Sequence, residues 1–79
     1  MTRLAMAAFL ARVAGASLSA CTSAPFPDVP VDHPFCKEIN WLKVNGIATG
    51  FEDGNYRPTA IVTRQAMAAF IFRTWMVMR

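Results

Sequence analysis

The sequence predicts an all-α protein built from a repeated unit. Residues 2–12 recur as residues 63–73, with eight of the eleven aligned positions identical at an offset of 61 residues. Both copies begin with Thr-Arg and carry apolar residues at helical spacing, whereas the segment between them is rich in proline and glycine. A repeat of this period indicates one supersecondary unit used several times, with neighbouring units completing each other's cores. We therefore expect the end of one unit followed by one full unit.

The composition supports a unit that belongs to a larger array. A chain of 79 residues holds one small domain at most, and such a domain is marginal unless it is stapled, metallated or assembled. Yet 54% of its residues are hydrophobic and only 16% are charged, so we expect further repeats to cover apolar surface. The net charge of +3 suits an anionic partner, but the scattered basic residues form no nucleic-acid arm. The sequence contains no apolar run of about 20 residues, so we expect no membrane span.

The first predicted helix covers residues 2–15. Thr2 can cap it, apolar residues follow at helical spacing, and Gly15 can end it. Residues 16–31 are small and proline-rich, which predicts a linker.

A second helix is expected to begin between Asp32 and Phe35, with Asp32 as its cap and Pro34 in its first turn. The Asn-Gly pair at 45–46 is a strong stop signal. One face is apolar, formed by residues at i, i+4 and i+7: Phe35, Ile39 and Leu42.

The remaining chain is predicted to form a long loop and a third helix. Residues 46–62 contain the turn pair Asp53-Gly54, and we expect Phe51 and Tyr56 to pin this loop to the core. The third helix starts at Thr63 and is predicted to run to the end of the chain. Its apolar positions nearly encircle it, so we expect it to be central and covered by neighbours.

Two cysteines, Cys21 and Cys36, flank the proline-rich part of the linker. A flexible loop between helices is a good place for a disulfide, and a bridge across such a loop contributes roughly 3 kcal/mol in the chain-entropy model. A disulfide implies an oxidising compartment. The alternative interpretation is two unrelated buried thiols.

An ordered series of short motifs runs through the rest of the chain. It comprises Phe26-x-Asp28-Val29-Pro30, His33, Ile39-x-x-Leu42, Gly46-Ile47-x-x-Gly50-Phe51-x-Asp53-Gly54-x-Tyr56-x-Pro58 and Val62-Thr63-Arg64. This order resembles one complete repeat of the surface-layer homology (SLH) domain family, and residues 2–15 resemble the closing helix of the repeat before it. The resemblance divides the chain into a closing helix at 1–15, a linker at 16–25 and a complete repeat at 26–79.

The resemblance implies a secreted, non-catalytic, all-helical repeat with a helix–long loop–helix plan and no cofactor. Members of this family usually come in threes and anchor proteins non-covalently to cell-wall polysaccharide. Ligand grooves lie between adjacent repeats. The implied partners are therefore an anionic cell-wall polysaccharide and neighbouring SLH repeats in cis or in trans, at the cell wall or cell surface.

The resemblance also implies which residues contact the glycan. The family's Thr-Arg-Ala-Glu segment supplies an arginine to the anionic polymer, and the matching residues are Arg64 and Arg3. Thr63 and Thr2 are the corresponding helix caps. A helix start, with free backbone N–H groups beside an arginine, is a suitable place for a carboxylate.

Two departures from the family pattern affect this expectation. Ala66, and Ala5 in the first copy, stand where the family has the glutamate of a capping box, so the reciprocal capping bond is lost. Pro34 also follows His33 where the family has an aromatic residue. The missing glutamate somewhat favours an alternative function, a pure repeat-assembly element that binds no glycan.

A second alternative is a lipoprotein. The sequence Leu18-Ser19-Ala20-Cys21 resembles a lipobox, whose processing would lipidate Cys21 and remove residues 1–20. Arg12 interrupts the supposed apolar signal, however, and the repeat explains residues 2–12 fully. These two points favour the repeat.

Catalytic and metal chemistry find little support in the sequence. His33 is the sole histidine, and we expect it to pack or hydrogen-bond rather than act as a base. Zinc needs about four ligands, whereas Cys21, Cys36 and His33 are three at unfamiliar spacing. Trp41 and Trp75 could stack on sugar rings, but core packing is the default for aromatic residues on apolar helices. We therefore expect no enzyme activity and no metal.

Overall fold

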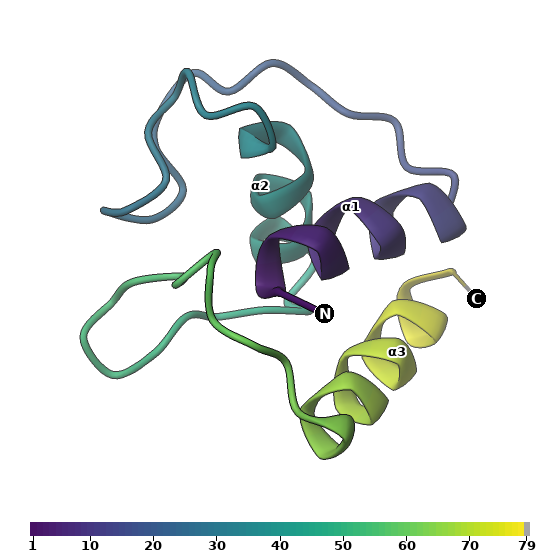
Figure 1. Ribbon diagram of the computed structural model, residues 1–79. Coiled ribbons are helices and arrows are strands. Elements are labelled where there is room, and N and C mark those ends of the chain that lie inside the picture. Colours follow the sequence, from purple (N-terminus) through teal and green to yellow (C-terminus); the bar gives the residue numbers. More distant parts are fainter. Residues whose placement is uncertain (79) are drawn as a thin grey trace.

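The computed structural model describes residues 1–78 and contains three helices joined by two long irregular segments (Figure 1). The helices are α1 (Arg3–Val13), α2 (Cys36–Val44) and α3 (Arg64–Met78). Within the described residues no β-strand forms beyond two isolated bridges. The predicted all-α fold is confirmed. Residue 79, the last residue of the predicted repeat and third helix, lies outside the described residues.

The core lies where α1 crosses α2 and is closed by the two irregular segments (Figure 1). A fully buried large apolar side chain contributes about 1.5–3 kcal/mol, so these segments stabilise the fold as the helices do. The fully buried large side chains come from α1, from α2 and from the irregular segments on either side of α2: Met6, Leu10, Val29, Cys36, Ile39, Leu42, Ile47 and Tyr56.

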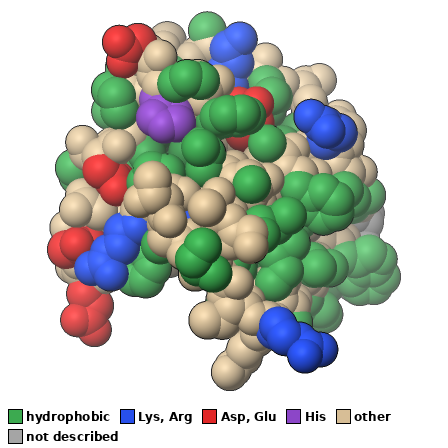
Figure 2. Space-filling model, in the orientation of Figure 1, with side chains coloured by type: hydrophobic (Ala, Val, Ile, Leu, Met, Phe, Trp, Pro, Cys, Tyr) green, Lys and Arg blue, Asp and Glu red, His purple; other side chains and the backbone are tan. Residues whose placement is uncertain are grey.

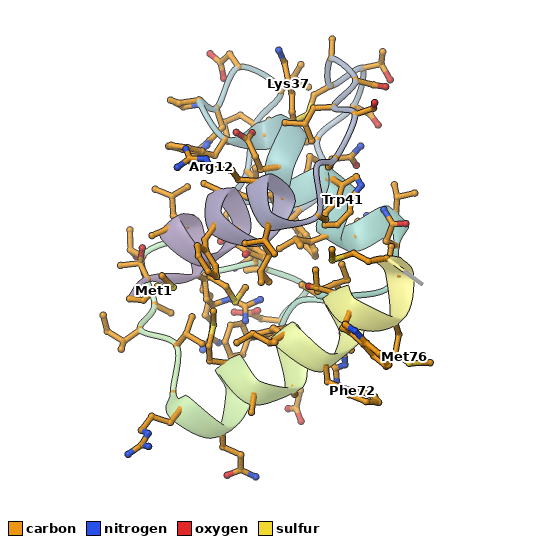
Figure 3. The ribbon with its side chains drawn as sticks, turned by 90° about the vertical axis from the view of Figure 1, so that its right-hand side faces the viewer. Met1, Arg12, Lys37, Trp41, Phe72 and Met76 are labelled. Atoms are coloured by element: carbon orange, nitrogen blue, oxygen red, sulfur yellow. A yellow bond between two sulfur atoms is a disulfide. The ribbon has the colours of Figure 1, made fainter. Side chains whose placement is uncertain are left out.

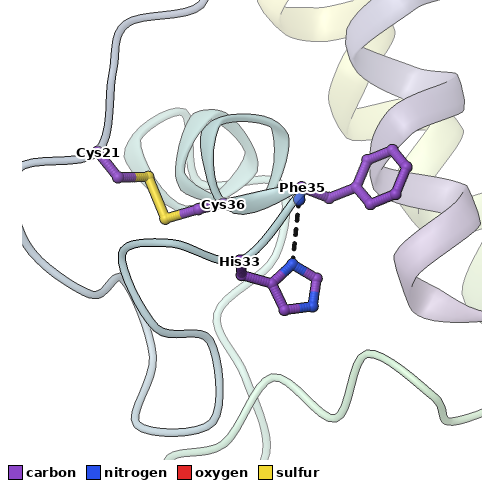
Figure 4. The surroundings of a disulfide bond; sticks show 4 residues. All are labelled: Cys21, His33, Phe35 and Cys36. Carbon is purple, nitrogen blue, oxygen red and sulfur yellow. Dashed lines mark hydrogen bonds between the residues drawn. A yellow bond between two sulfur atoms is a disulfide. The ribbon is translucent and has the colours of Figure 1, made fainter.

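The start of α2 differs from the prediction. The helix begins at Cys36 and its N-cap residue, Phe35, makes no side-chain capping bond. Asp32 is exposed and does not cap the helix, so that expectation was wrong. Instead His33 Nδ1 accepts a hydrogen bond from the Phe35 backbone N–H at 3.0 Å (Figure 4). The turn before Pro34 brings the imidazole to the helix start, and the predicted hydrogen-bonding role of His33 is confirmed.

The predicted disulfide joins Cys21 to Cys36, with their Cα atoms 6.3 Å apart (Figure 4). It ties the linker to the first residue of α2, and Lys43 Nζ donates to the Pro25 carbonyl at 2.6 Å near the other end of the helix. The sulfur of Cys21 is therefore already bonded to Cys36, which contradicts the lipobox interpretation because a lipid would occupy the same atom.

Asp28 holds the second irregular segment in place. Its Oδ1 accepts from the Tyr56 backbone N–H at 2.9 Å and its Oδ2 from the Arg57 N–H at 2.8 Å. Arg57 has a left-handed backbone, with φ of 57°, and such a conformation needs support from its surroundings. The loop is also close to Phe26 at Gly50, where φ is 86° and a Cβ atom would lie 2.9 Å from the ring.

The expectation that α3 is central and covered was wrong. Only Phe70 and Thr74 of this helix are buried. Figure 2 shows hydrophobic side chains gathered on the side where α3 lies, and Ile71 and Phe72 are 49% and 60% exposed. The physical reason is that α3 makes few contacts with the other helices, and an open apolar groove lies between Ile71 and Leu10 of α1. No helix within residues 1–78 has the length and apolar character needed to cross a membrane.

Candidate functional site

Arg3, the first residue of α1, is the centre of the candidate site. Its side chain is only 8% exposed, which is unusual for arginine. Its Nε donates to the Tyr56 carbonyl, and the Tyr56 hydroxyl donates to the Arg3 carbonyl at 2.8 Å. This reciprocal pair of bonds joins the start of α1 to a loop 53 positions later in the sequence.

Three aromatic rings surround the Arg3 guanidinium. Its central carbon lies 4.3 Å from the ring centroid of Tyr56, 4.7 Å from that of Phe51 and 5.6 Å from that of Phe70. A cation over an aromatic face is attracted by the negative face of the ring, by up to about 2 kcal/mol when desolvated. The rings therefore hold the guanidinium in place without neutralising its charge.

No carboxylate among the described residues forms an ion pair with Arg3. The one ion pair within residues 1–78 joins Arg57 to Asp53 at 3.0 Å, on the surface. Desolvation lowers the pKa of Arg3, opposed by weaker effects of Tyr56 and Asp28, but a guanidinium stays protonated in proteins. Burial also raises the pKa of Tyr56 to about 12, so its hydroxyl remains a donor at neutral pH. The site thus carries an uncompensated positive charge.

The Arg3 side chain lines a pocket of about 230 Å³. No buried side-chain nitrogen or oxygen atom in the described chain lacks a hydrogen-bond partner. The two Nη groups of Arg3 have no such partner, so they keep access to solvent. They are therefore available to a ligand in the pocket. The other residues that line it come from the second irregular segment and α3: Phe51, Ile61, Val62, Thr63, Ala66 and Phe70.

The backbone N–H groups at the start of α1 are not free, contrary to the prediction. The N–H groups of Arg3 and Leu4 donate to the carbonyls of Ala60 and Pro58 at 2.8 and 2.9 Å. Thr2 caps the helix, since its Oγ1 accepts from the third N–H group. Residues 58–62 return to α1 and satisfy the N–H groups of Arg3 and Leu4, which leaves the guanidinium rather than the helix start to hold an anion.

The sequence of this chain resembles known proteins over most of its length. The family model for the S-layer homology domain matches residues 25–68, more than half of the chain. The chain belongs to the S-layer homology domain family. It is also 42% identical over 72 residues to S-layer protein EA1 of Bacillus anthracis, an alignment that covers 91% of this chain and 8% of that protein. No solved structure gives a significant match.

The second predicted contact of the SLH chain, Arg64, lies in a different environment. Its side chain is exposed and contacts no aromatic ring or acidic group among the described residues. Thr63 Oγ1 caps α3 by accepting from the Ala66 N–H at 3.1 Å. The structure therefore does not bring Arg64 to the Arg3 pocket, although Thr63 and Ala66 line it.

The two copies of the helix differ in what covers them. On α1 the face that packs on the core is at most 3% exposed and consists of Met6, Ala7, Leu10 and Ala11. The residues 61 positions later are Met67, Ala68, Ile71 and Phe72, and of these the last three are exposed. This face of the repeated helix is therefore covered on α1 and exposed on α3 within the described chain. The pocket beside the arginine forms at α1, where that arginine is Arg3.

Sequence reasoning missed most of the residues around Arg3. It expected Phe51 to pin the loop to the core, whereas this ring is 39% exposed and contacts both Arg3 and Arg57. It also assigned no role to Phe70 or to Asp28, which positions the Tyr56 loop. Phe51, Tyr56 and Asp28 belong to the SLH motifs of the sequence. They are far from Arg3 along the chain, so the motifs alone did not predict that the two rings contact Arg3 or that Asp28 holds their loop.

A metal site and His33 were the other candidates that the sequence offered. No group of three or more His, Cys, Asp or Glu side chains within residues 1–78 is arranged to hold a metal ion. His33, whose Nδ1 is used at the start of α2, lies apart from the residues that line the Arg3 pocket.

Proposed function

We propose that this SLH chain is a non-catalytic cell-surface anchoring module that binds an anionic cell-wall polysaccharide non-covalently. Family membership and the S-layer relative support the cell-surface role. The observation that carries the glycan contact is the buried, uncompensated Arg3 guanidinium with two accessible Nη groups. In this proposal residues 1–15 close one repeat, residues 16–25 are the linker and residues 26–79 form the next repeat.

The pocket explains how one arginine can hold a charged sugar. A carboxylate or phosphate accepts two N–H bonds from a guanidinium, and charge-assisted bonds are about twice as strong as neutral ones. The rings of Phe51 and Phe70 cover part of the guanidinium and lower the local dielectric constant, which strengthens the electrostatic attraction. A polymer presents the same charged group many times, so several such pockets in one protein gain avidity.

Neighbouring SLH repeats, in cis or in trans, are the second class of partner in this proposal. The uncovered face of α3 corresponds position by position to the face of α1 that α2 covers. A following repeat on α3 would bury Ile71 and Phe72 and bring its own loop to Arg64. Arg64 would then contact glycan only in the assembled array.

A pure assembly element remains the second candidate. The exposed apolar face of α3 favours it, and so do the bonds between Arg3 and Tyr56, which also stabilise the fold. Such a chain would self-associate and ignore glycan, which light scattering at several concentrations, with and without wall polymer, would show.

The decisive test removes the charge of Arg3 while keeping a side chain of similar size. We expect Arg3→Met to lose about tenfold or more in binding to purified wall sacculi, equivalent to about 1.4 kcal/mol or more. Arg12→Met removes one exposed charge from the same helix and is expected to bind like the parent. Sacculi stripped of their secondary polymer should retain none of the three proteins.

Circular dichroism of each variant shows whether it is folded. If folded Arg3→Met binds sacculi as the parent does, the glycan role of Arg3 is refuted and the assembly element is favoured.

A further inference from the structure

A second pocket, of about 210 Å³, lies between the linker and the outer face of α2. Lys37, Asn40 and Trp41 stand at i, i+3 and i+4, so they share one helix face, and Ser17 and Ser19 line the pocket from the linker. In Figure 3 Trp41 lies on the opposite side of the molecule from Met1, whose carbonyl bonds to the segment that borders the Arg3 pocket. The two pockets share no lining residue.

The polar groups that line this second pocket have no hydrogen-bond partner among the described residues. The Lys37 ammonium, the Asn40 amide and the Trp41 indole N–H make no hydrogen bond or ion pair to a described residue, and neither do the hydroxyls of Ser17 and Ser19. By contrast, Lys43 and Asn45, on the same helix and just after it, donate to backbone carbonyls. Donors and acceptors that converge on one hollow are typical of a ligand site.

Trp41 supplies an apolar surface among these polar groups. It is half-buried and packs against the core cluster, while part of it lines the pocket. An aromatic face carries partial negative charge, which suits the C–H groups on one face of a sugar ring. The amide and hydroxyl groups match sugar hydroxyls, and Lys37 adds a positive charge that no carboxylate in the described chain neutralises.

The disulfide joins the two walls of the pocket. Cys36 directly precedes Lys37 on α2, and Cys21 follows Ser19 by two positions in the linker. The bond therefore limits how far the linker can move from the helix. A site whose walls are held together before the ligand arrives loses less entropy on binding.

We propose that this pocket is a carbohydrate subsite for an anionic sugar residue, separate from the Arg3 pocket. The sugar ring lies against Trp41, its carboxylate or phosphate faces Lys37, and its hydroxyls bond to Asn40 and the linker serines. This site does not depend on the proposed role of Arg3.

Nuclear magnetic resonance on the oxidised, ¹⁵N-labelled chain tests the proposal directly. The indole N–H of Trp41 reports on the pocket, and that of Trp75 on α3 is an internal control. We expect D-glucuronate to shift the Trp41 signal with a dissociation constant on the order of 1–10 mM, as suits one shallow contact. D-glucose, which lacks the charge, should bind several-fold more weakly.

Variants assign the effect to the lining residues. Lys37→Gln should remove the preference for glucuronate over glucose, and Asn40→Ala should weaken both sugars. Arg12→Gln, with the same loss of charge elsewhere, should bind as the parent does. Arg3→Met should still show the Trp41 shift even if it no longer binds sacculi, which separates this site from the Arg3 pocket. The proposal is overturned if glucuronate leaves the Trp41 signal unmoved, shifts Trp75 equally, or binds Lys37→Gln unchanged.

Discussion

Asp28 positions the residues around Arg3 although it does not line the Arg3 pocket. Its carboxylate accepts the N–H groups of Tyr56 and Arg57, which fixes the loop that carries Phe51 and Tyr56 to the Arg3 guanidinium. Each bond to a charged acceptor contributes about 1.5–3 kcal/mol. Asp28 therefore stabilises the fold and positions the site at the same time.

We expect Asp28→Asn to lower the free energy of unfolding by about 2 kcal/mol. The amide oxygen can replace one acceptor, but the amide NH₂ faces a backbone N–H and leaves it unsatisfied. Urea unfolding measures the loss, and Asp32→Asn is the control because Asp32 is exposed. Equal unfolding midpoints for the two variants would contradict this role.

At the level of single residues, the sequence predicted the arginine but not its surroundings. The Thr-Arg motif identified Arg3 and Arg64 as equivalent. The structure makes them unequal, because only Arg3 meets a loop that returns from residues 51–62. Contacts across about fifty residues of chain follow from packing, which no local pattern reports.

The linker is attached to α2 near both ends of the helix, by a disulfide and by a hydrogen bond. The Cys21–Cys36 disulfide holds the first residue of α2, and Lys43 holds Pro25 near its last turn. This matters for α2 because it has only nine residues and no side-chain cap. A helix of this length is marginal by itself and depends on tertiary contacts.

Reduction of the disulfide is expected to lower the free energy of unfolding by roughly 3 kcal/mol, because it releases a loop between residues 15 positions apart. Denaturant titration of the oxidised and reduced chains measures this difference. The Cys21→Ala/Cys36→Ala double variant serves as the control, since reductant should leave its unfolding midpoint unchanged. An oxidised parent no more stable than this variant would argue against a stabilising bridge.

The molecule as a whole exposes apolar surface on both copies of its repeated helix. Phe9 and Val13 of α1 are 45% and 52% exposed, and Ile71 and Phe72 of α3 are similarly open. Phe70, the counterpart of Phe9, is by contrast buried. The two helices therefore leave different faces uncovered, as consecutive units of an array would before their neighbours are added.

The isolated chain is therefore expected to self-associate at high concentration through its apolar faces. We expect Phe72→Ser to reduce this association while changing the free energy of unfolding by less than about 1 kcal/mol, because Phe72 is mostly exposed. Light scattering over a concentration series measures the association. Val31→Ser, at an exposed position before α2, should associate as the parent does, and similar behaviour of both variants would exclude the α3 face.

The sequence by itself determined the helical class, the long-loop plan, the disulfide and the family, because these depend on local spacing, turn residues and short motifs. It misplaced the start of α2 and the environment of α3. Only the tertiary structure decided that one copy of the repeated helix is covered and the other exposed, and that Arg3 lies among three rings. The physical reason is that burial depends on which distant segments pack together, and two nearly identical helix sequences do not specify which segments will cover them.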